Sequence, residues 1–177
     1  MQPSRGVLFY GPRGCGKTLL AKAVTSELSA NFVSIEGPKL LTTAVRESVA
    51  TIGKAFAKAY AAAPCVLFFD ELDSIGTACS RGDFGCNGDR VMNQLITELD
   101  SVCMRKDVFF IGATERPDLL DDELPRRLDL CMYIPLPDLV ARQGILHCRL
   151  RKSRIAPDVP MSFVAQKTEG FSGADLA

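Results

Sequence analysis

Residues 11–18 read Gly11-Pro12-Arg13-Gly14-Cys15-Gly16-Lys17-Thr18, which matches the pattern G-x-x-x-x-G-K-[ST] in full. An apolar run at 7–10 predicts a strand before them, and the pattern of 17–28 predicts a helix after them. This context is typical of a loop that binds phosphate. Its glycines let backbone N–H groups point inward, Lys17 can reach the β- and γ-phosphates, and the Thr18 hydroxyl can ligate Mg²⁺. The alternative is a glycine-rich turn that binds nothing.

Strands and helices alternate over the following hundred or so residues. Apolar runs predict strands at 31–35, 65–69, 108–113 and 131–134. Apolar residues at helical spacing predict helices at 17–28, with Leu20, Val24 and Leu28 on one stripe, at 45–62, and at 89–99, with Asp89 as cap. Four glycines and few apolar residues predict a loop over 76–88. This order predicts an α/β fold with a doubly wound parallel sheet and helices on both faces.

The pattern changes after Pro137. Residues 139–150 and 161–167 predict two helices, and Ser172 with Asp175 three residues later is typical of a helix start. The chain ends two residues after Asp175, which is too short for a useful helix. The sequence is therefore expected to be a fragment.

Acidic residues follow the apolar run at 65–69. Ligands bind at the carboxyl edge of open α/β sheets, so Asp70 is expected to hold Mg²⁺ through water and Glu71 to polarise an attacking water. Taken alone, the pair could equally cap the next helix, and the phosphate loop upstream favours catalysis. Thr114 and Glu115 end the next strand at the same edge, where they could face a γ-phosphate or simply form a strand-to-loop exit.

Composition excludes several classes of protein. The 177 residues carry 21 Lys and Arg against 21 Asp and Glu, so a nucleic-acid binder held by bulk positive charge is excluded. The longest apolar run, 61–69, is far short of a membrane span. Seven scattered cysteines without a CxxC pair predict reduced thiols, and hence a location in the cytoplasm or nucleus.

Several longer stretches together resemble the AAA ATPase family, most closely the second ATPase domain of the valosin-containing protein type. These stretches are Gly6–Pro12, Gly14–Ala23, Ala63–Ile75, Tyr133–Asp138 and Gly170–Leu176. The resemblance implies a P-loop NTPase fold of the AAA type with the start of a small helical lid. Residues 1–136 would form the large nucleotide-binding subdomain without its N-terminal part, and 137–177 the beginning of the lid.

The resemblance also implies an activity and partners. ATP and Mg²⁺ would bind in a hexameric ring, formed by this chain or with related subunits, that unfolds or segregates protein substrates, including ubiquitinated ones. Leu19 would join the phosphate loop in holding the nucleotide, and Gly173 and Ala174 would approach the adenine. Arg127 matches the second of two arginine fingers that reach into a neighbour's site, and the first finger is absent unless Arg126 substitutes for it.

Three departures from the family pattern bear on activity. The family's pore loop grips substrate with an aromatic residue, and the matching positions here are Ala44, Val45 and Arg46. The loop that carries the arginine fingers is two residues shorter than in the family. Glu115 stands where the family has the sensor Asn that positions the attacking water. Two hypotheses follow: an ATPase with weakened hydrolysis, and a nucleotide-binding regulatory module that does not turn over. A phosphoryl-transfer kinase is disfavoured because the sequence has no acceptor-binding feature.

Overall fold

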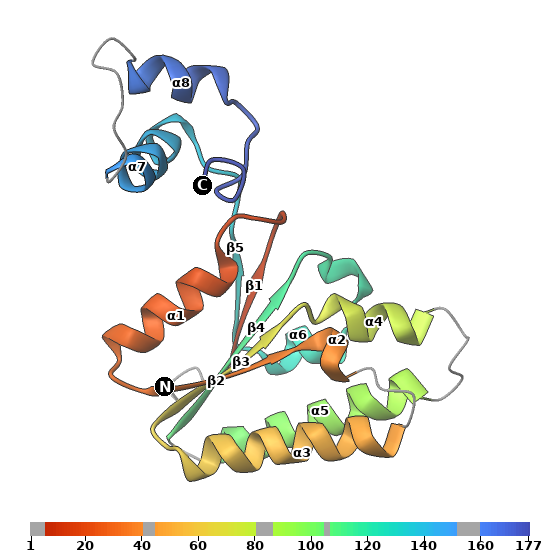
Figure 1. The fold of residues 1–177 in the computed structure, drawn as a ribbon. Helices are drawn as coiled ribbons and strands as arrows, with labels where there is room; N and C mark the ends of the chain where they lie inside the picture. The colour runs from red at the N-terminus through yellow and green to blue at the C-terminus, as the bar shows by residue number, and fades with distance from the viewer. Residues whose placement is uncertain (1–5, 41–44, 81–86, 105–106, 152–159) are drawn as a thin grey trace. The chain divides into compact units, whose positions relative to one another are not determined.

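The computed structural model describes residues 6–40, 45–80, 87–104, 107–151 and 160–177. Its centre is a five-stranded sheet with the order β2-β3-β4-β1-β5, in which every neighbouring pair is parallel (Figure 1). The predicted doubly wound parallel sheet is confirmed. The strands are β1 (Gly6–Tyr10), β2 (Asn31–Glu36), β3 (Cys65–Asp70), β4 (Val108–Thr114) and β5 (Leu130–Tyr133).

Helices connect the parallel strands, as crossovers in such a sheet require. Figure 1 shows α1 on one side of the sheet and α3 with α5 on the other. None of the helices in the described ranges is long and apolar enough to cross a membrane. The helical elements are α1 (Lys17–Glu27), α2 (Gly37–Leu40), α3 (Val45–Ala61), α4 (Asp73–Ser80), α5 (Asn87–Met104), the 3-10 helix η1 (Pro117–Leu119), α6 (Glu123–Arg127), α7 (Leu139–Leu150) and α8 (Met161–Lys167).

The main core lies between the central strands and the helices α3 and α5. The first five residues of β3 are fully buried, as a parallel strand covered on both faces should be. Phe56 of α3 packs on Phe69 of β3 with ring centroids 5.9 Å apart, and Phe69 packs on Phe110 of β4 at 5.3 Å. This aromatic row fixes the position of the strand that ends at Asp70.

The predicted loop over 76–88 is partly wrong, because α4 continues through Ser80 and α5 begins at Asn87. Gly76 suggested a loop, yet it sits inside α4. A Cβ there would overlap the carbonyl oxygen of Leu119, so the glycine allows close packing of α4 against η1. The cap predicted at Asp89 is also wrong, because Asp89 lies inside α5. That helix extends past Leu99 because Val102, 1% exposed, continues its buried stripe.

In two elements, α1 and β4, the buried residues do not follow the apolar pattern of the sequence. In α1 the buried residues after Lys17 are Ala21 and Thr25, whereas Leu20, Val24 and Leu28 are each at least 36% exposed. In β4, Phe109 is 36% exposed, so the strand is not buried throughout. The helix start predicted at Ser172 forms hydrogen-bonded turns, with Leu176 N–H donating to Ser172 O at 3.3 Å.

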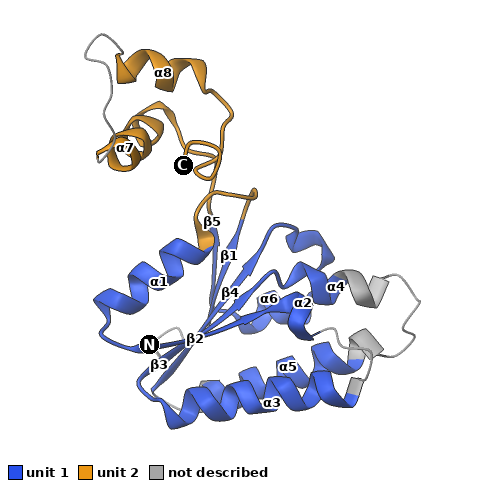
Figure 2. Ribbon diagram, viewed as in Figure 1, with its two compact units in different colours: residues 1–10, 18–133 blue, residues 11–17, 134–177 orange. Residues whose placement is uncertain are grey.

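The chain forms two compact units (Figure 2). The first, called the sheet unit, comprises residues 1–10 and 18–133 and contains the whole sheet. The second, called the loop–lid unit, comprises residues 11–17 and 134–177 and joins the glycine-rich loop to α7 and α8. In the loop–lid unit, Leu146, Ala165 and Leu176 form a small apolar core.

Candidate nucleotide site

Three glycines shape the loop that begins the loop–lid unit. Gly11, Gly14 and Gly16 have φ angles of 146°, 75° and 90°, in the region that side chains disfavour. A Cβ at Gly16 would have no atom within 4 Å, so its backbone conformation, rather than lack of space, requires glycine. Positive φ angles within a tight loop allow backbone N–H groups to point into one concavity, which is how a backbone cradles an anion.

The Lys17 ammonium is held inside this loop. Its side chain is 8% exposed in total, and Nζ donates to the carbonyl oxygens of Gly11 and Pro12, each at 2.8 Å. Both of these partners are uncharged carbonyl groups, so no carboxylate among them competes with an incoming anion. Burial raises the pKa of the neighbouring Cys15 thiol, although the Lys17 charge acts in the opposite direction. Cys15 is therefore a neutral lining residue.

The lid residues predicted to approach adenine lie beside the loop within the same unit. Ala174 N–H donates to Gly14 O at 3.0 Å, and a Cβ on Gly173 would lie 3.2 Å from that oxygen. Ser172 and Asp175 bond reciprocally, which lowers the pKa of Asp175. A cavity of about 390 Å³ opens here, lined by Cys15, Pro135, Leu136, Pro137, Asp138, Ala141, Ile145 and Gly173. Apart from Asp138, whose carboxylate accepts from the Ala141 N–H, the lining is apolar or small, which suits a flat heterocycle.

Thr18 and Asp70 meet in the sheet unit. Thr18 stands at the start of α1, Asp70 ends β3, and the Thr18 hydroxyl donates to Asp70 Oδ2 at 2.6 Å. Both residues are half-buried. A hydroxyl and a carboxylate are hard oxygen ligands of the kind that Mg²⁺ prefers, so the donor set fits this metal. Leu19, the next residue of α1, is 64% exposed.

Glu71 leaves β3 in a strained conformation. Its φ of 54° lies in the left-handed region, which is uncommon for a residue other than glycine, and its side chain is exposed. Such strain is typical of functional positions, where surrounding contacts hold it. The structure therefore gives Glu71 a fixed backbone and an accessible carboxylate.

Thr114 and Glu115 end β4 beside the start of α4. The Thr114 hydroxyl donates to Asp73 Oδ1 at 3.0 Å and accepts from Arg116 N–H at 3.1 Å. Thr114 is 1% exposed and its hydroxyl bonds within the protein, an arrangement that fits the strand-to-loop exit, one of the two alternatives that the sequence left open. The Glu115 N–H also donates to Asp73 Oδ1, at 3.1 Å, and its side chain is exposed. The role of Asp73 was not predicted.

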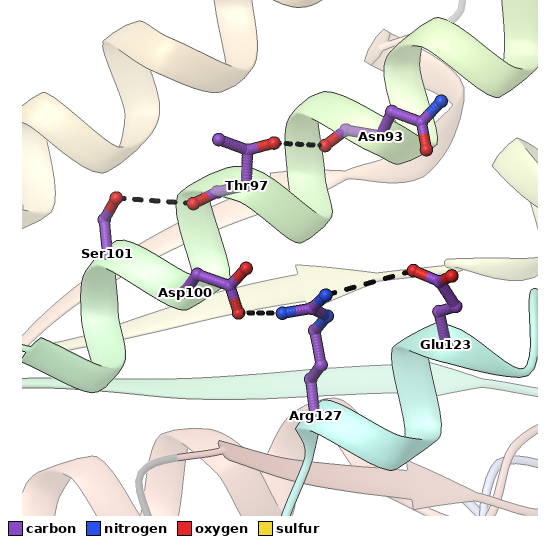
Figure 3. A network of polar contacts seen from close by, with 6 residues as sticks. All are labelled: Asn93, Thr97, Asp100, Ser101, Glu123 and Arg127. Carbon is purple, nitrogen blue, oxygen red and sulfur yellow. Dashed lines mark hydrogen bonds and ion pairs between the residues drawn. The ribbon is translucent and has the colours of Figure 1, made fainter.

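The two candidate arginine fingers end α6. Arg127 pairs with Asp100 of α5 through Nη1, and its Nη2 lies 3.9 Å from Glu123 Oε2 (Figure 3). The Arg127 side chain is 36% exposed, and Arg126 beside it is exposed. Of the predicted pore loop, Ala44 lies outside the described residues, Val45 begins α3 and Arg46 is exposed.

Comparison with protein-family models identifies the family of this chain. The model described as ATPase family associated with various cellular activities (AAA) matches residues 7–136, which is most of the chain. The match spans the phosphate loop, the Asp70–Glu71 strand end and the arginine pair. Members of this family are nucleotide-binding ATPase modules that use ATP and Mg²⁺. The five-stranded parallel sheet with flanking helices is the fold expected of them, and the chain belongs to the AAA family.

Proposed function

We propose that this chain binds Mg-ATP through residues 11–19 and hydrolyses it with Glu71 as the general base. The observation that carries the proposal is the 2.6 Å hydrogen bond from Thr18 to Asp70, which brings a phosphate-loop hydroxyl to the carboxylate that ends β3. Lys17 and Thr18 are consecutive residues, so the buried ammonium and the hydroxyl proposed to hold Mg²⁺ are neighbours along the chain. Gly173 and Ala174 would approach the adenine.

Each residue has a distinct task in this proposal. Lys17 binds the β- and γ-phosphates, and Thr18 and Asp70 hold Mg²⁺, Asp70 through water. When bound, Mg²⁺ neutralises charge that develops on the phosphates. Glu71 accepts a proton from the attacking water.

We further propose the cellular role that the closest resemblance implies. Residues 1–136 would be the large subdomain and 137–177 the lid of a module like the second ATPase domain of the valosin-containing protein type. It would work in a hexameric ring, alone or with related subunits, and unfold or segregate protein substrates, including ubiquitinated ones. Without an aromatic at Ala44, Val45 and Arg46, its grip on a threaded substrate would be weaker than the family pattern provides.

Replacing Lys17 with Ala is expected to weaken ATP binding about 30-fold. A hydrogen bond to a charged group contributes about 2 kcal/mol, and each 1.4 kcal/mol is tenfold in affinity. Isothermal titration of the full-length protein with Mg-ATP measures this change. Lys22→Ala is the matched control, because Lys22 is an exposed lysine on the same helix. Equal affinities for wild type and Lys17→Ala would contradict the proposed site.

Replacing Glu115 with Asn is expected to raise ATP turnover about fivefold. An ionised Glu only accepts hydrogen bonds, whereas Asn can also donate, and so can orient a water. Two carboxylates ~5 Å apart repel by ~3 kcal/mol at an effective dielectric near 20. Glu71 and Glu115 are both exposed, so solvent screening reduces this to ~1 kcal/mol, about fivefold in rate. Steady-state turnover at saturating ATP measures the change.

The same variant separates the two hypotheses about activity. Glu115→Gln is its matched control, because it removes the charge but keeps the longer side chain. A Glu115→Asn variant that gains turnover supports an ATPase slowed by this residue. If wild type and both variants bind ATP but none hydrolyses it, the nucleotide-binding regulatory module is the better description.

A further inference from the structure

The backbone of Glu71 is held in its left-handed conformation by the first turn of α4. The Ser74 hydroxyl donates to the Glu71 carbonyl oxygen at 2.8 Å, and the Ser74 N–H donates to the same oxygen at 3.1 Å. On the other side, the Glu71 N–H donates to Asp70 Oδ1 at 3.1 Å. The backbone N–H and C=O of Glu71 are thus both hydrogen-bonded, which offsets the cost of its positive φ.

Gly37 closes this arrangement from the neighbouring strand. It follows β2 directly, and Glu36 at the end of β2 is in register with Asp70 at the end of β3. A Cβ on Gly37 would overlap both the Glu71 carbonyl oxygen and the Ser74 hydroxyl. Here glycine is required by close approach, because any larger residue would push the carbonyl off its donor.

The same turn also fixes the end of β4. Leu72 N–H donates to Ala113 O at 3.0 Å, and Asp73 Oδ1 accepts from the Thr114 hydroxyl and the Glu115 N–H. Three consecutive residues, 72–74, therefore bond either to the exit of β4 or to Glu71. A plain helix cap would satisfy only the first amides of its own helix.

We propose that Ser74 is a positioning residue for hydrolysis: it holds the backbone of Glu71 and so sets the direction of the Glu71 carboxylate, while Asp73 ties the same turn to the end of β4. This inference rests on the proposed role of Glu71 as general base. A general base must lie within hydrogen-bond reach of the water that it deprotonates, and a shift of about 1 Å can cost 10²-fold in rate. Ser74 acts through the backbone of Glu71 and does not itself contact substrate.

Replacing Ser74 with Ala is expected to lower kcat for ATP about tenfold while KM changes less than twofold. The variant loses one of the two Ser74 donors to the Glu71 carbonyl oxygen and keeps the N–H, so the backbone is held less firmly and the carboxylate samples directions away from the water. Ser74→Thr keeps the hydroxyl and should retain most of the wild-type kcat. Thr51→Val is the matched control, because it deletes a helix hydroxyl that donates to Glu47 O at 2.7 Å, away from the strand ends. Both deletions should shift Tm by similar small amounts.

A crystal structure of Ser74→Ala gives a second measurement that does not depend on activity. The expected result is a Glu71 φ that returns to negative values. Wild-type kcat in Ser74→Ala, or a fall in kcat with Glu71 still left-handed, would overturn the inference and leave the proposed function intact. A wild-type protein without ATPase activity would instead overturn the proposed function. In that case an unchanged Glu71 φ in Ser74→Ala would also show that the Ser74 hydroxyl does not hold the Glu71 backbone.

Discussion

Replacing Glu71 with Gln is expected to lower ATP turnover ~100-fold or more, because a positioned general base contributes 10²–10⁴ to rate. Gln has nearly the same shape as Glu but cannot accept the proton of the attacking water at neutral pH. The backbone bonds to Asp70 and Ser74 do not involve the Glu71 side chain, so its conformation should persist. Phosphate release under saturating Mg-ATP measures the change.

ATP affinity supplies the control for this variant. The groups proposed to bind the nucleotide are Lys17, Thr18 and the loop backbone, so Glu71→Gln should bind ATP within twofold of wild type. Glu27→Gln, an exposed position on α1, should leave both turnover and affinity unchanged. Turnover retained in Glu71→Gln would show that another group accepts the proton.

The fold could be predicted because two local signals agree. The loop at 11–18 requires a strand before it and a helix after it. The run at 65–69 is apolar on both faces, which only a covered parallel strand tolerates. Together they fix the strand direction and the edge where ligands bind. Only small shifts separate the predicted and observed strands, such as 31–35 against Asn31–Glu36.

The errors in the fold arise from contacts that no local pattern contains. Gly76 is indistinguishable from a loop glycine until the carbonyl of Leu119 is known to lie against it. In α1 the apolar stripe of Leu20, Val24 and Leu28 suggested the buried face, whereas Ala21 and Thr25 are buried. Periodicity identifies a helix correctly, yet it does not reveal which side of that helix the rest of the fold covers.

In the candidate site, too, local patterns identified some residues and missed one whose partners are distant in sequence. The partnership of Thr18 and Asp70 follows from motif spacing, and the structure places the two oxygens 2.6 Å apart. Asp73 was passed over because one more acidic residue after Asp70 and Glu71 resembles a solvated helix start. Its real partners, Thr114 and Glu115, come from another strand more than forty positions away. A pairing over that separation cannot be read from local sequence.

Replacing Arg127 with Ala is expected to lower turnover about 100-fold or more in an assembled ring, because an arginine finger is worth 10³–10⁵ in related phosphoryl transfer. The pairs with Asp100 and Glu123 do not prevent this role (Figure 3). All three side chains are at least 36% exposed, and exposed ion pairs contribute about 0–1 kcal/mol. Arg127 can therefore leave them at small cost when a neighbour's nucleotide offers a stronger partner.

Variants of Arg127 and its neighbours distinguish an arginine finger, which acts on nucleotide, from a residue that only forms a structural ion pair. Asp100→Asn removes the charge of the in-chain partner and keeps Arg127, so turnover should stay at or above wild type. Arg126→Ala, alone and combined with Arg127→Ala, measures whether Arg126 substitutes for the missing first finger. Arg90→Ala, at an exposed arginine of α5, is the matched control. If Asp100→Asn loses as much turnover as Arg127→Ala, the ion pair itself is what matters.

Mixing two inactive variants tests whether Arg127 acts on a neighbouring subunit. An Arg127→Ala chain keeps its own Glu71, and a Glu71→Gln chain keeps a finger to donate. In a ring built by head-to-tail contacts, random mixing at equal amounts gives about a quarter of the interfaces both intact groups. Turnover of the mixture should then exceed that of either variant alone by roughly tenfold or more, since each lacks a group worth at least 10². A mixture that only averages its two components would place Arg127 outside the neighbour's site.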